Sequence, residues 1–448
     1  RMDFSQFSAL AAQYAKENGI KDYELYYQTD SSDQLGAFSG EIDRMSGAAV
    51  EGVSVTCFVD GRGGSASTEN LTEEEIPALF ARAAEAAKFG APGCPFSGSE
   101  SYEALEDPET VQTDTAREKE LILSAGTRAQ KLDSRIEKGV TAGVAVVSIR
   151  RAIANSSGLF LSGSGGMTVF SAGVVAKDEN GRRYNGYSVQ AYRSLSEVDA
   201  DAVVRRAVEK TVSQIGASPV PSGKYPVIFD ASQMTQLLEI FSSAFSARQV
   251  QEGLSLLSGK LNQPVASEWV TLIDDPFYPG NFFPAAFDAE GVRTYRKNIV
   301  ENGLLKTYFY DRSAAEKDHT ESTGNAYRES YDSPVSIAPF TFYMKPGTMS
   351  REELLKKAGR AVMITFMKGA HAGANAVTGD FSLESKGFLV EDGKIVRPVE
   401  EITVAGNFYR LLKDITAVAN DLEVNAEDGM SCCGAPTVLV SSLAVAGN

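Results

Sequence analysis

The sequence predicts an α+β fold: an N-terminal α/β domain with a mostly antiparallel sheet, then a C-terminal β-barrel-like domain with a few helices. The first part alternates helical periodicity with amphipathic strands and hairpin turns, which is typical of this class. Pro219, Pro221 and Gly223 then interrupt the pattern and divide the chain into domains 1–218 and 219–448. Beyond them, β-branched and aromatic runs between Gly, Pro and Asp turns predict a curved or barrel-like sheet.

The N-terminal elements follow from periodicity and from capping residues. Apolar side chains at helical spacing predict a helix over Asp3–Asn18, which Asp3 can cap. A strand is expected over Tyr23–Thr29. In Val53–Val59, apolar residues alternate with Ser54, Thr56 and Phe58, as in a strand with one buried face. Asp60-Gly61 is a strong hairpin signal.

The remaining predicted elements continue this alternation. A second helix starts near Thr72, and a Pro- and Gly-rich connection spans Gly90–Glu109. The other elements expected in the first domain are a helix over Asp114–Asp133, strands over Val140–Ile153, Thr168–Ala176 and Tyr184–Tyr192, and a helix over Ser196–Gln214. In the second domain we expect strands over Tyr225–Phe229 and Val438–Val445, and helices over Ser232–Ala247 and Arg351–Met367.

Composition narrows the possible classes of protein. The chain has 448 residues, of which 43% are hydrophobic and 23% charged, as in ordinary globular proteins. No stretch approaches the roughly 18 consecutive apolar residues of a membrane helix, and Arg1 to Gln6 shows no secretory signal. The four cysteines lack the spacing of a disulfide framework and suit a reducing compartment. We therefore expect a cytoplasmic protein that does not enter a membrane.

The net charge of −16 argues against direct binding to nucleic acid. Proteins that bind DNA or RNA usually present a basic face, because neutralising phosphates drives their association. Here Arg150-Arg151, Arg182-Arg183 and Arg205-Arg206 are isolated pairs in an acidic chain.

No metal site is predicted in this chain. A catalytic zinc usually takes three protein ligands, mostly histidine. The sequence holds two histidines, His319 and His371, and neither belongs to a His-x-x-x-His or His-Glu-x-x-His arrangement. Both could still meet a cysteine in space, although an ordinary polar role is the favoured interpretation of each.

Other candidate sites have plain structural alternatives. Gly163-Ser164-Gly165-Gly166 lacks the end of a phosphate-binding loop and is interpreted as a turn. Asp274-Asp275 precedes a proline and is expected to cap a turn. Cys432 and Cys433 are the most reactive-looking residues, but the neighbouring Glu427 and Asp428 would raise a thiol pKa, so buried inert cysteines are favoured.

The densest constellation of polar and small residues runs from Gly369 to Ser382. Its small residues would let another backbone approach closely. Five polar side chains could bind such a backbone and are our candidates for a peptide groove: His371, Asn375, Thr378, Asp380 and Ser382. From residue chemistry alone, a tight turn that joins a helix to a strand fits equally well.

This run, read on through Gly387–Ile395 and Pro398–Asn407, resembles the C-terminal signature of the TldD/PmbA family. Further stretches agree with the resemblance, so that it spans nearly the whole chain: 51–55, 58–62, 66–68, 287–294 and 322–328. The family implies an N-terminal α/β domain, a C-terminal β-barrel-like domain and a dimer around a central cavity. Its older label, modulator of DNA gyrase, reflects indirect effects.

The resemblance also implies where a zinc site would lie. The TldD branch resembles a zinc protease with His-Glu-x-x-x-His on a helix, which falls on Ser232–Ala247 here. The best register places Ser242, Ser243 and Ala247 at those three positions, and these side chains cannot seat zinc or activate water. The TldD branch also carries a cysteine after a Gly-Met pair. Here Cys432 and Cys433 follow Gly429-Met430-Ser431 and are the thiols that remain at this place.

The departure from the zinc motif favours the PmbA/TldE-type branch. Members of that branch pair with a TldD-type protease, and the pair is associated with trimming unstructured peptides. We therefore expect a subunit that binds no cofactor, shapes the peptide chamber, and works beside a TldD-type partner holding the zinc, or as a homodimer. The alternatives are a homodimeric peptide-binding protein without catalysis and a peptidase that uses a non-zinc site such as a cysteine.

Overall fold

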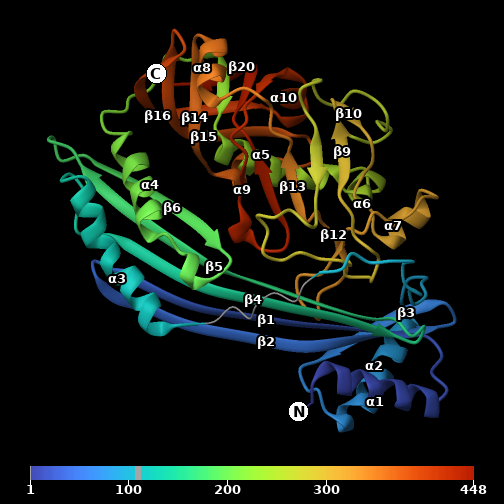
Figure 1. Ribbon diagram of the computed structural model, residues 1–448. Coiled ribbons are helices and arrows are strands. Elements are labelled where there is room, and N and C mark those ends of the chain that lie inside the picture. The colour runs from blue at the N-terminus through green and yellow to red at the C-terminus, as the bar shows by residue number, and fades with distance from the viewer. Residues whose placement is uncertain (1, 106–112, 448) are drawn as a thin grey trace.

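A long twisted antiparallel sheet forms the N-terminal half of the molecule, and the C-terminal half is seated on it (Figure 1). The computed structural model describes residues 2–105 and 113–447. It confirms the predicted α+β class, with the antiparallel sheet in the first half and a closed five-stranded barrel in the second. In the described part of the chain, no helix has both the length and the apolar character needed to cross a membrane.

The N-terminal sheet has the strand order β3-β2-β1-β4-β5-β6. Three of its six strands are much longer than the sequence pattern predicts. In β2 the added residues 41–50 are all exposed, so no buried face marks them in the sequence. The strands are β1 (Tyr23–Phe38), β2 (Glu41–Val59), β3 (Arg62–Thr68), β4 (Thr141–Asn155), β5 (Phe160–Lys177) and β6 (Arg183–Tyr192).

Alternate residues of this sheet pack against different partners. Leu25 packs with α1 (Phe4–Glu17) and α2 (Ile76–Ala87), and Leu35 packs with α3 (Thr115–Leu132) and α4 (Ala200–Val212). Tyr26, which points the other way in β1, packs against the C-terminal half. The side chains of Asp3, Asp114 and Asp199 cap α1, α3 and α4.

Short 3₁₀ turns precede two of these helices: η1 (Glu73–Glu75) and η2 (Leu195–Glu197). The end of the connection predicted over Gly90–Glu109, residues 106–109, lies outside the described residues.

The barrel of the C-terminal half closes because β16 pairs with both β15 and β20. Its strands, in order around the ring, are β16 (Lys394–Asn407), β15 (Asp380–Glu391), β14 (Ala361–Lys368), β7 (Gly223–Phe229) and β20 (Val438–Ala446), and β17 (Ile415–Val418) adds to β20. A second sheet holds β10 (Leu304–Leu305), β9 (Lys297–Glu301), β8 (Leu272–Asp274), β13 (Thr341–Met344), β19 (Cys432–Ala435) and β18 (Glu423–Val424), and β11 (Ala326–Tyr327) pairs with β12 (Ser336–Ile337).

Helix α5 (Ala231–Phe241) contributes to the largest apolar core, which the barrel and the second sheet share. Its Phe241 stacks on Phe408 with ring centroids 4.6 Å apart. The other short helices of this half are η3 (Ser242–Phe245), α6 (Ala247–Gln251), α7 (Arg312–Lys317), α8 (Arg351–Ala358), α9 (Ala370–Gly373), α10 (Phe408–Asp414) and η4 (Ala426–Asp428).

Two predicted helices of this half are shorter than expected. The helix predicted over Arg351–Met367 ends at Ala358, because Gly359 takes a positive φ of 66° and the apolar run that follows forms β14. This run is buried on both faces, so its periodicity could not separate strand from helix. The helix predicted over Ser232–Ala247 breaks after Phe241 into η3 and α6.

The structure also corrects two predicted turns. Gly163–Gly166 lies within β5. Of the aspartate pair, Asp275 does cap a turn through the amide of Phe277, but Asp274 is fully buried at the end of β8. There it accepts hydrogen bonds from the Phe340 amide and the Asn325 side chain.

The glycines of β5 determine how closely the two halves approach each other. The Gly166 amide donates to the carbonyl of Phe282 in the C-terminal half. A Cβ on Gly165 would lie 2.7 Å from that carbonyl oxygen and 2.8 Å from the Cα of Phe283. The absence of a side chain at Gly165 therefore permits direct contact between the two backbones.

We expect Gly165→Ala to destabilise the protein by about 1–3 kcal/mol, because backbone atoms must move to admit the methyl group. Gly163→Ala is the matched control, since its Cβ would meet only the Phe287 ring at 3.6 Å, an ordinary contact distance. Denaturant titration of both variants measures the difference. Equal stability of the two would contradict this account of the junction.

Candidate functional site

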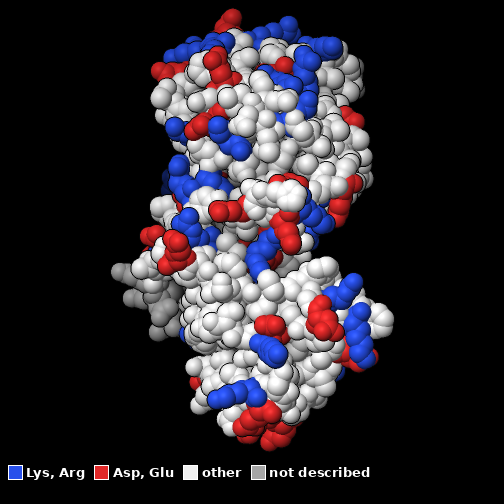
Figure 2. Space-filling view, turned by 90° about the vertical axis from the view of Figure 1, so that its right-hand side faces the viewer, with Lys and Arg blue, Asp and Glu red and all other residues white. Residues whose placement is uncertain are grey.

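A polar pocket of about 540 Å³ lies between the N-terminal sheet and the loops of the C-terminal half. The molecule narrows where the two halves meet, and charged side chains of both signs cluster there (Figure 2). One wall consists of residues from β1, β2 and β3 and the other of residues from 290 to 335, while Pro92, Gly93 and Cys94 contribute part of the rim.

Two cross-strand rows of polar residues build the sheet side of the pocket. Glu24 of β1 pairs with Thr56 of β2, which pairs with Ser65 of β3. The Thr56 and Ser65 hydroxyls are 2.8 Å apart. In the next row, Ser54 pairs with Ser67. Because side chains alternate along a strand, Ser54 and Thr56 face the pocket while Val53 and Val55 pack with α2.

Arg328 comes from the C-terminal half and is held rigidly over the sheet. Its guanidinium lies 4.8 Å from the centroid of the Tyr26 ring, and Nη1 donates to Ser54 Oγ at 3.1 Å and to the carbonyl of Tyr331. The side chain is buried, and its Nε has no hydrogen-bond partner among the described residues.

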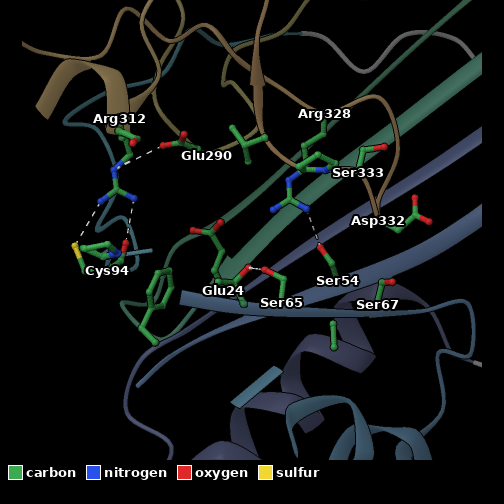
Figure 3. Close-up of a pocket in the computed structure, with 18 of the residues that line it drawn as sticks. Glu24, Ser54, Ser65, Ser67, Cys94, Glu290, Arg312, Arg328, Asp332 and Ser333 are labelled. Carbon is green, nitrogen blue, oxygen red and sulfur yellow. Dashed lines mark hydrogen bonds and ion pairs between the residues drawn. The ribbon is translucent and has the colours of Figure 1, made fainter. Parts of the chain in front are cut away.

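Arg312 and Glu290 lie at the opposite side of the pocket. Arg312, the first residue of α7, stacks over Phe96 at 5.1 Å and donates to the carbonyl and the Sγ of Cys94. Its Nε is 3.9 Å from Glu290 Oε2. In Figure 3 the Glu24 carboxylate lies between the guanidinium groups of Arg312 and Arg328.

Asp288 fixes the loops that carry Glu290 and Arg328. This fully buried carboxylate accepts hydrogen bonds from the amides of Glu290, Val292 and Ala326. It therefore ties the 287–294 and 322–328 stretches together beside the pocket.

Burial raises the pKa of several carboxyl groups at this site. It raises the pKa of Glu24 from 4.5 to about 7, although Arg328 and Arg312 oppose the shift. Burial also raises the pKa of Asp288 to about 6, and burial together with the nearby Asp288 raises that of Glu290 well above its ordinary value. The site thus holds carboxyl groups that are costly to ionise without a cation nearby.

The five groove candidates lie elsewhere: His371 in α9, Asn375 and Thr378 on the turn between α9 and β15, and Asp380 and Ser382 on the first residues of β15. Three of them stabilise this turn itself. Asn375 Oδ1 accepts from the amides of Val377 and Thr378, Thr378 Oγ1 accepts from the Asp380 amide, and Asp380 Oδ1 accepts from Asn407. His371 and Ser382 are exposed beside them. The turn interpretation accounts for these bonds, and peptide contact stays a prediction.

The residues at the expected zinc positions do not share one helical face. Ser242 and Ser243 belong to η3, Ser246 is extended, and Ala247 begins α6. Ala247 is fully buried, and its amide donates to the carbonyl of Phe309. Across the described residues, no group of three His, Cys, Asp or Glu side chains could hold a metal ion. The residues present therefore do not fit a zinc ion.

The two candidate thiols are buried in β19. Burial raises the pKa of Cys432 to about 12, with Asp428, Asp274 and Glu427 adding to the shift, and burial raises that of Cys433 as well. The Cys432 Sγ lies 3.7 Å from Thr341 Oγ1. Their environment is that of inert core cysteines.

Sequence reasoning missed Glu24, Glu290, Arg312 and Arg328, although signals for three parts of the pocket were present. Ser54 and Thr56 are the polar members of an alternating strand. Glu290 and Arg328 belong to two of the stretches quoted for the family resemblance. The sequence could not reveal that these distant stretches meet, because their contact depends on the docking of the two halves.

Comparison with known proteins gives a consistent result along the chain. Three family models match it: PmbA/TldA metallopeptidase domain 1 over residues 23–87, the central domain over residues 106–215, and the C-terminal domain over residues 222–447.

Individual relatives agree with these matches. The chain is 27% identical to a protein of Escherichia coli O157:H7 named metalloprotease PmbA, over 91% of this chain and 88% of that protein. A crystal structure of a candidate modulator of DNA gyrase from Thermotoga maritima matches with a TM-score of 0.91 and 31% identity, over 99% of this chain and all of that one. The crystal structure of TldE from Thermococcus kodakarensis shares the fold, with a TM-score of 0.82 and 24% identity over 97% of this chain and all of that chain.

We expect one cysteine of the native protein, Cys94, to react rapidly with a thiol reagent such as 5,5′-dithiobis(2-nitrobenzoate). Cys94 is exposed, whereas Cys57, Cys432 and Cys433 are buried, and burial disfavours the reactive thiolate. Counting the modified thiols in native and denatured protein checks this expectation, and Cys94→Ser should remove the fast phase. Rapid modification of Cys432 or Cys433 would support the cysteine-peptidase alternative instead.

The raised pKa of Glu24 predicts a pH-dependent stability. The unfolded chain ionises this carboxyl near pH 4.5, while the folded protein retains the proton to about pH 7. Stability from this group is therefore full below pH 4.5 and is lost as the pH rises to about 7. Relative to Glu24→Gln, the wild-type free energy of unfolding should fall by on the order of 3 kcal/mol over this interval. Denaturant titrations across the pH range measure the difference.

The exposed Glu85→Gln on α2 is the matched control for this series, with an expected change in stability within about 0.5 kcal/mol. A wild-type minus Glu24→Gln difference that stays constant from pH 4.5 to 7 would show that Glu24 is solvated in the folded protein.

Proposed function

This chain belongs to the TldD/PmbA family of metallopeptidases, and we propose that it is a PmbA/TldE-type subunit that helps a TldD-type zinc protease act on unstructured peptides. In this role the TldD-type partner holds the zinc, and this chain contributes the shape and the contacts of the peptide chamber. Similarity to a protein named metalloprotease PmbA supports the placement in the family.

The observation that carries the proposal is the chemistry of residues 242–247. Zinc proteases need imidazole or carboxylate ligands and a base that activates water. The positions at which we expect these groups hold two serine hydroxyls and a buried methyl group, and a break between η3 and α6 separates Ala247 from the serines. A histidine at position 247 would have to replace a fully buried Ala in the core beside Phe309.

The exposed surface formed by α9, the turn after it and the start of β15 is our candidate for contact with the peptide, through His371, Asn375, Thr378, Asp380 and Ser382. The hydrogen bonds of Asn375, Thr378 and Asp380 keep this turn rigid. A rigid surface loses less conformational entropy when it binds an extended chain. Binding of an extended peptide at a strand edge is one established mode of such recognition.

We expect the purified chain alone to carry substoichiometric zinc and to leave an unstructured peptide intact. Addition of a TldD-type partner should give cleavage that a chelator abolishes, because the partner supplies the metal. Metal analysis by mass spectrometry and a peptidase assay with and without the partner measure both quantities.

Two controls make the result decisive. A partner in which the zinc-ligating histidines are replaced by alanine should give no cleavage with this chain, and the partner alone should cleave more slowly than the pair. Chelator-sensitive cleavage by this chain by itself would contradict the proposal. Peptide binding without cleavage under every condition would favour the homodimeric peptide-binding alternative.

A further inference from the structure

The interdomain pocket has no part in the proposed subunit role, yet it is built like a ligand site. It places groups of opposite charge around a cavity of about 540 Å³, and the groups come from separate elements of both halves. Pockets of roughly 300–1,000 Å³ suit small organic ligands. The question is which ligand chemistry would satisfy the groups that line it.

Arg328 supplies a cation at a fixed position in the cavity wall. The residue is 8% exposed, and the Tyr26 ring and the bonds from Nη1 fix the orientation of its guanidinium. Its Nε is enclosed by the protein and finds no acceptor within the described chain. A guanidinium at the wall of a cavity binds oxygen acceptors, and a carboxylate is the best of them.

Glu24 supplies the complementary acceptor. It is also 8% exposed, and in Figure 3 its carboxylate points into the cavity between the two arginines. A carboxylate can accept about four hydrogen bonds, and the Asn155 side chain is a partner for one. An ammonium group on a ligand would both donate to Glu24 and favour its ionised form. Glu290, whose carboxylate is 3.9 Å from the Arg312 side chain, adds a second carboxylate to the lining of the cavity.

The serine hydroxyls of the sheet offer contacts for the part of a ligand between its charged ends. Ser65 and Ser67 lie in successive outward-facing positions of β3, and Ser333 faces them from the C-terminal half. Hydroxyls both donate and accept, so they suit the amide groups of a main chain.

We propose that this pocket binds a short peptide with both ends free, a di- or tripeptide, with its carboxylate on Arg328 and its ammonium on Glu24. A ligand with only one charge would contact only one of these two buried groups. Both groups belong to this chain, so the inference can be tested on the full-length chain by itself.

Calorimetric titration of the full-length chain tests the inference. The ligands are trialanine, N-acetyl-trialanine, trialanine amide, dialanine and free alanine. We expect the unblocked di- or tripeptide to bind, and acetylation or amidation each to weaken binding at least tenfold. Free alanine, which is too short to fill the cavity, should bind more weakly than the peptides.

Two variants assign the ends of the peptide to their partners. Glu24→Gln should weaken trialanine at least tenfold but leave the affinity for the acetylated peptide unchanged. Arg328→Lys, which replaces the planar guanidinium by an ammonium group, should weaken trialanine and leave the affinity for the amide unchanged. Glu85→Gln on α2 and Arg205→Lys on α4, which are exposed and do not line the pocket, are the matched controls and should bind as the wild type does.

Several outcomes would overturn the proposal. They are no binding of any unblocked peptide at millimolar concentration, equal affinity for blocked and unblocked peptides, or variants that weaken all ligands alike. If a variant fails to fold, the series of blocked peptides on the wild-type chain still decides. Because no cleavage is measured, a failure here is distinct from a failure of the partner-dependent peptidase assay.

Discussion

The close backbone contact between β5 and the Phe282–Phe283 segment is the constraint on which the rest of the arrangement depends. The C-terminal half can take one defined position on the free face of a long sheet only if particular residues of the two halves contact each other. Gly165 and Gly166 give that place, since a strand without side chains lets a carbonyl reach its amide. Asp288, a few residues further along, then holds the loops that reach over β1–β3. The pocket is the space that remains between a rigid sheet and these tied loops.

The sequence was informative where one residue type decides the local structure. Asp3 and Asp114 start their helices where the sequence predicts, and Asp60-Gly61 turns the β2–β3 hairpin, with both residues at positive φ. The sequence was less informative for strands that are buried on both faces or on neither face. Most side chains of residues 361–368 are buried, on both faces of the strand, so their pattern could not distinguish a helix from a strand. Residues 41–50 are exposed, so no alternation of apolar and polar residues marked the extension of β2.

The candidate sites also differ in whether their signals are local in the sequence. The burial of Cys432 and Cys433 agrees with the interpretation drawn from their local acidic neighbours, while their low reactivity stays a prediction. The pocket could not be predicted, because Glu24 and Arg328 are 304 positions apart and their proximity depends on the glycine contact in β5. The glycine run itself was interpreted as a turn. A glycine inside a strand can mark either a bend or the close approach of another backbone, and only the fold distinguishes the two.

One further consequence concerns Cys94. It is exposed at the rim of the pocket, and its carbonyl and sulfur contact Arg312, while the other three cysteines are buried. The natural protein therefore already carries a unique attachment point for an environment-sensitive fluorophore, next to one of the charged groups that line the cavity. A dye placed there would sense changes in hydration and charge at the rim without any engineered residue, which makes the occupancy of the cavity observable in real time.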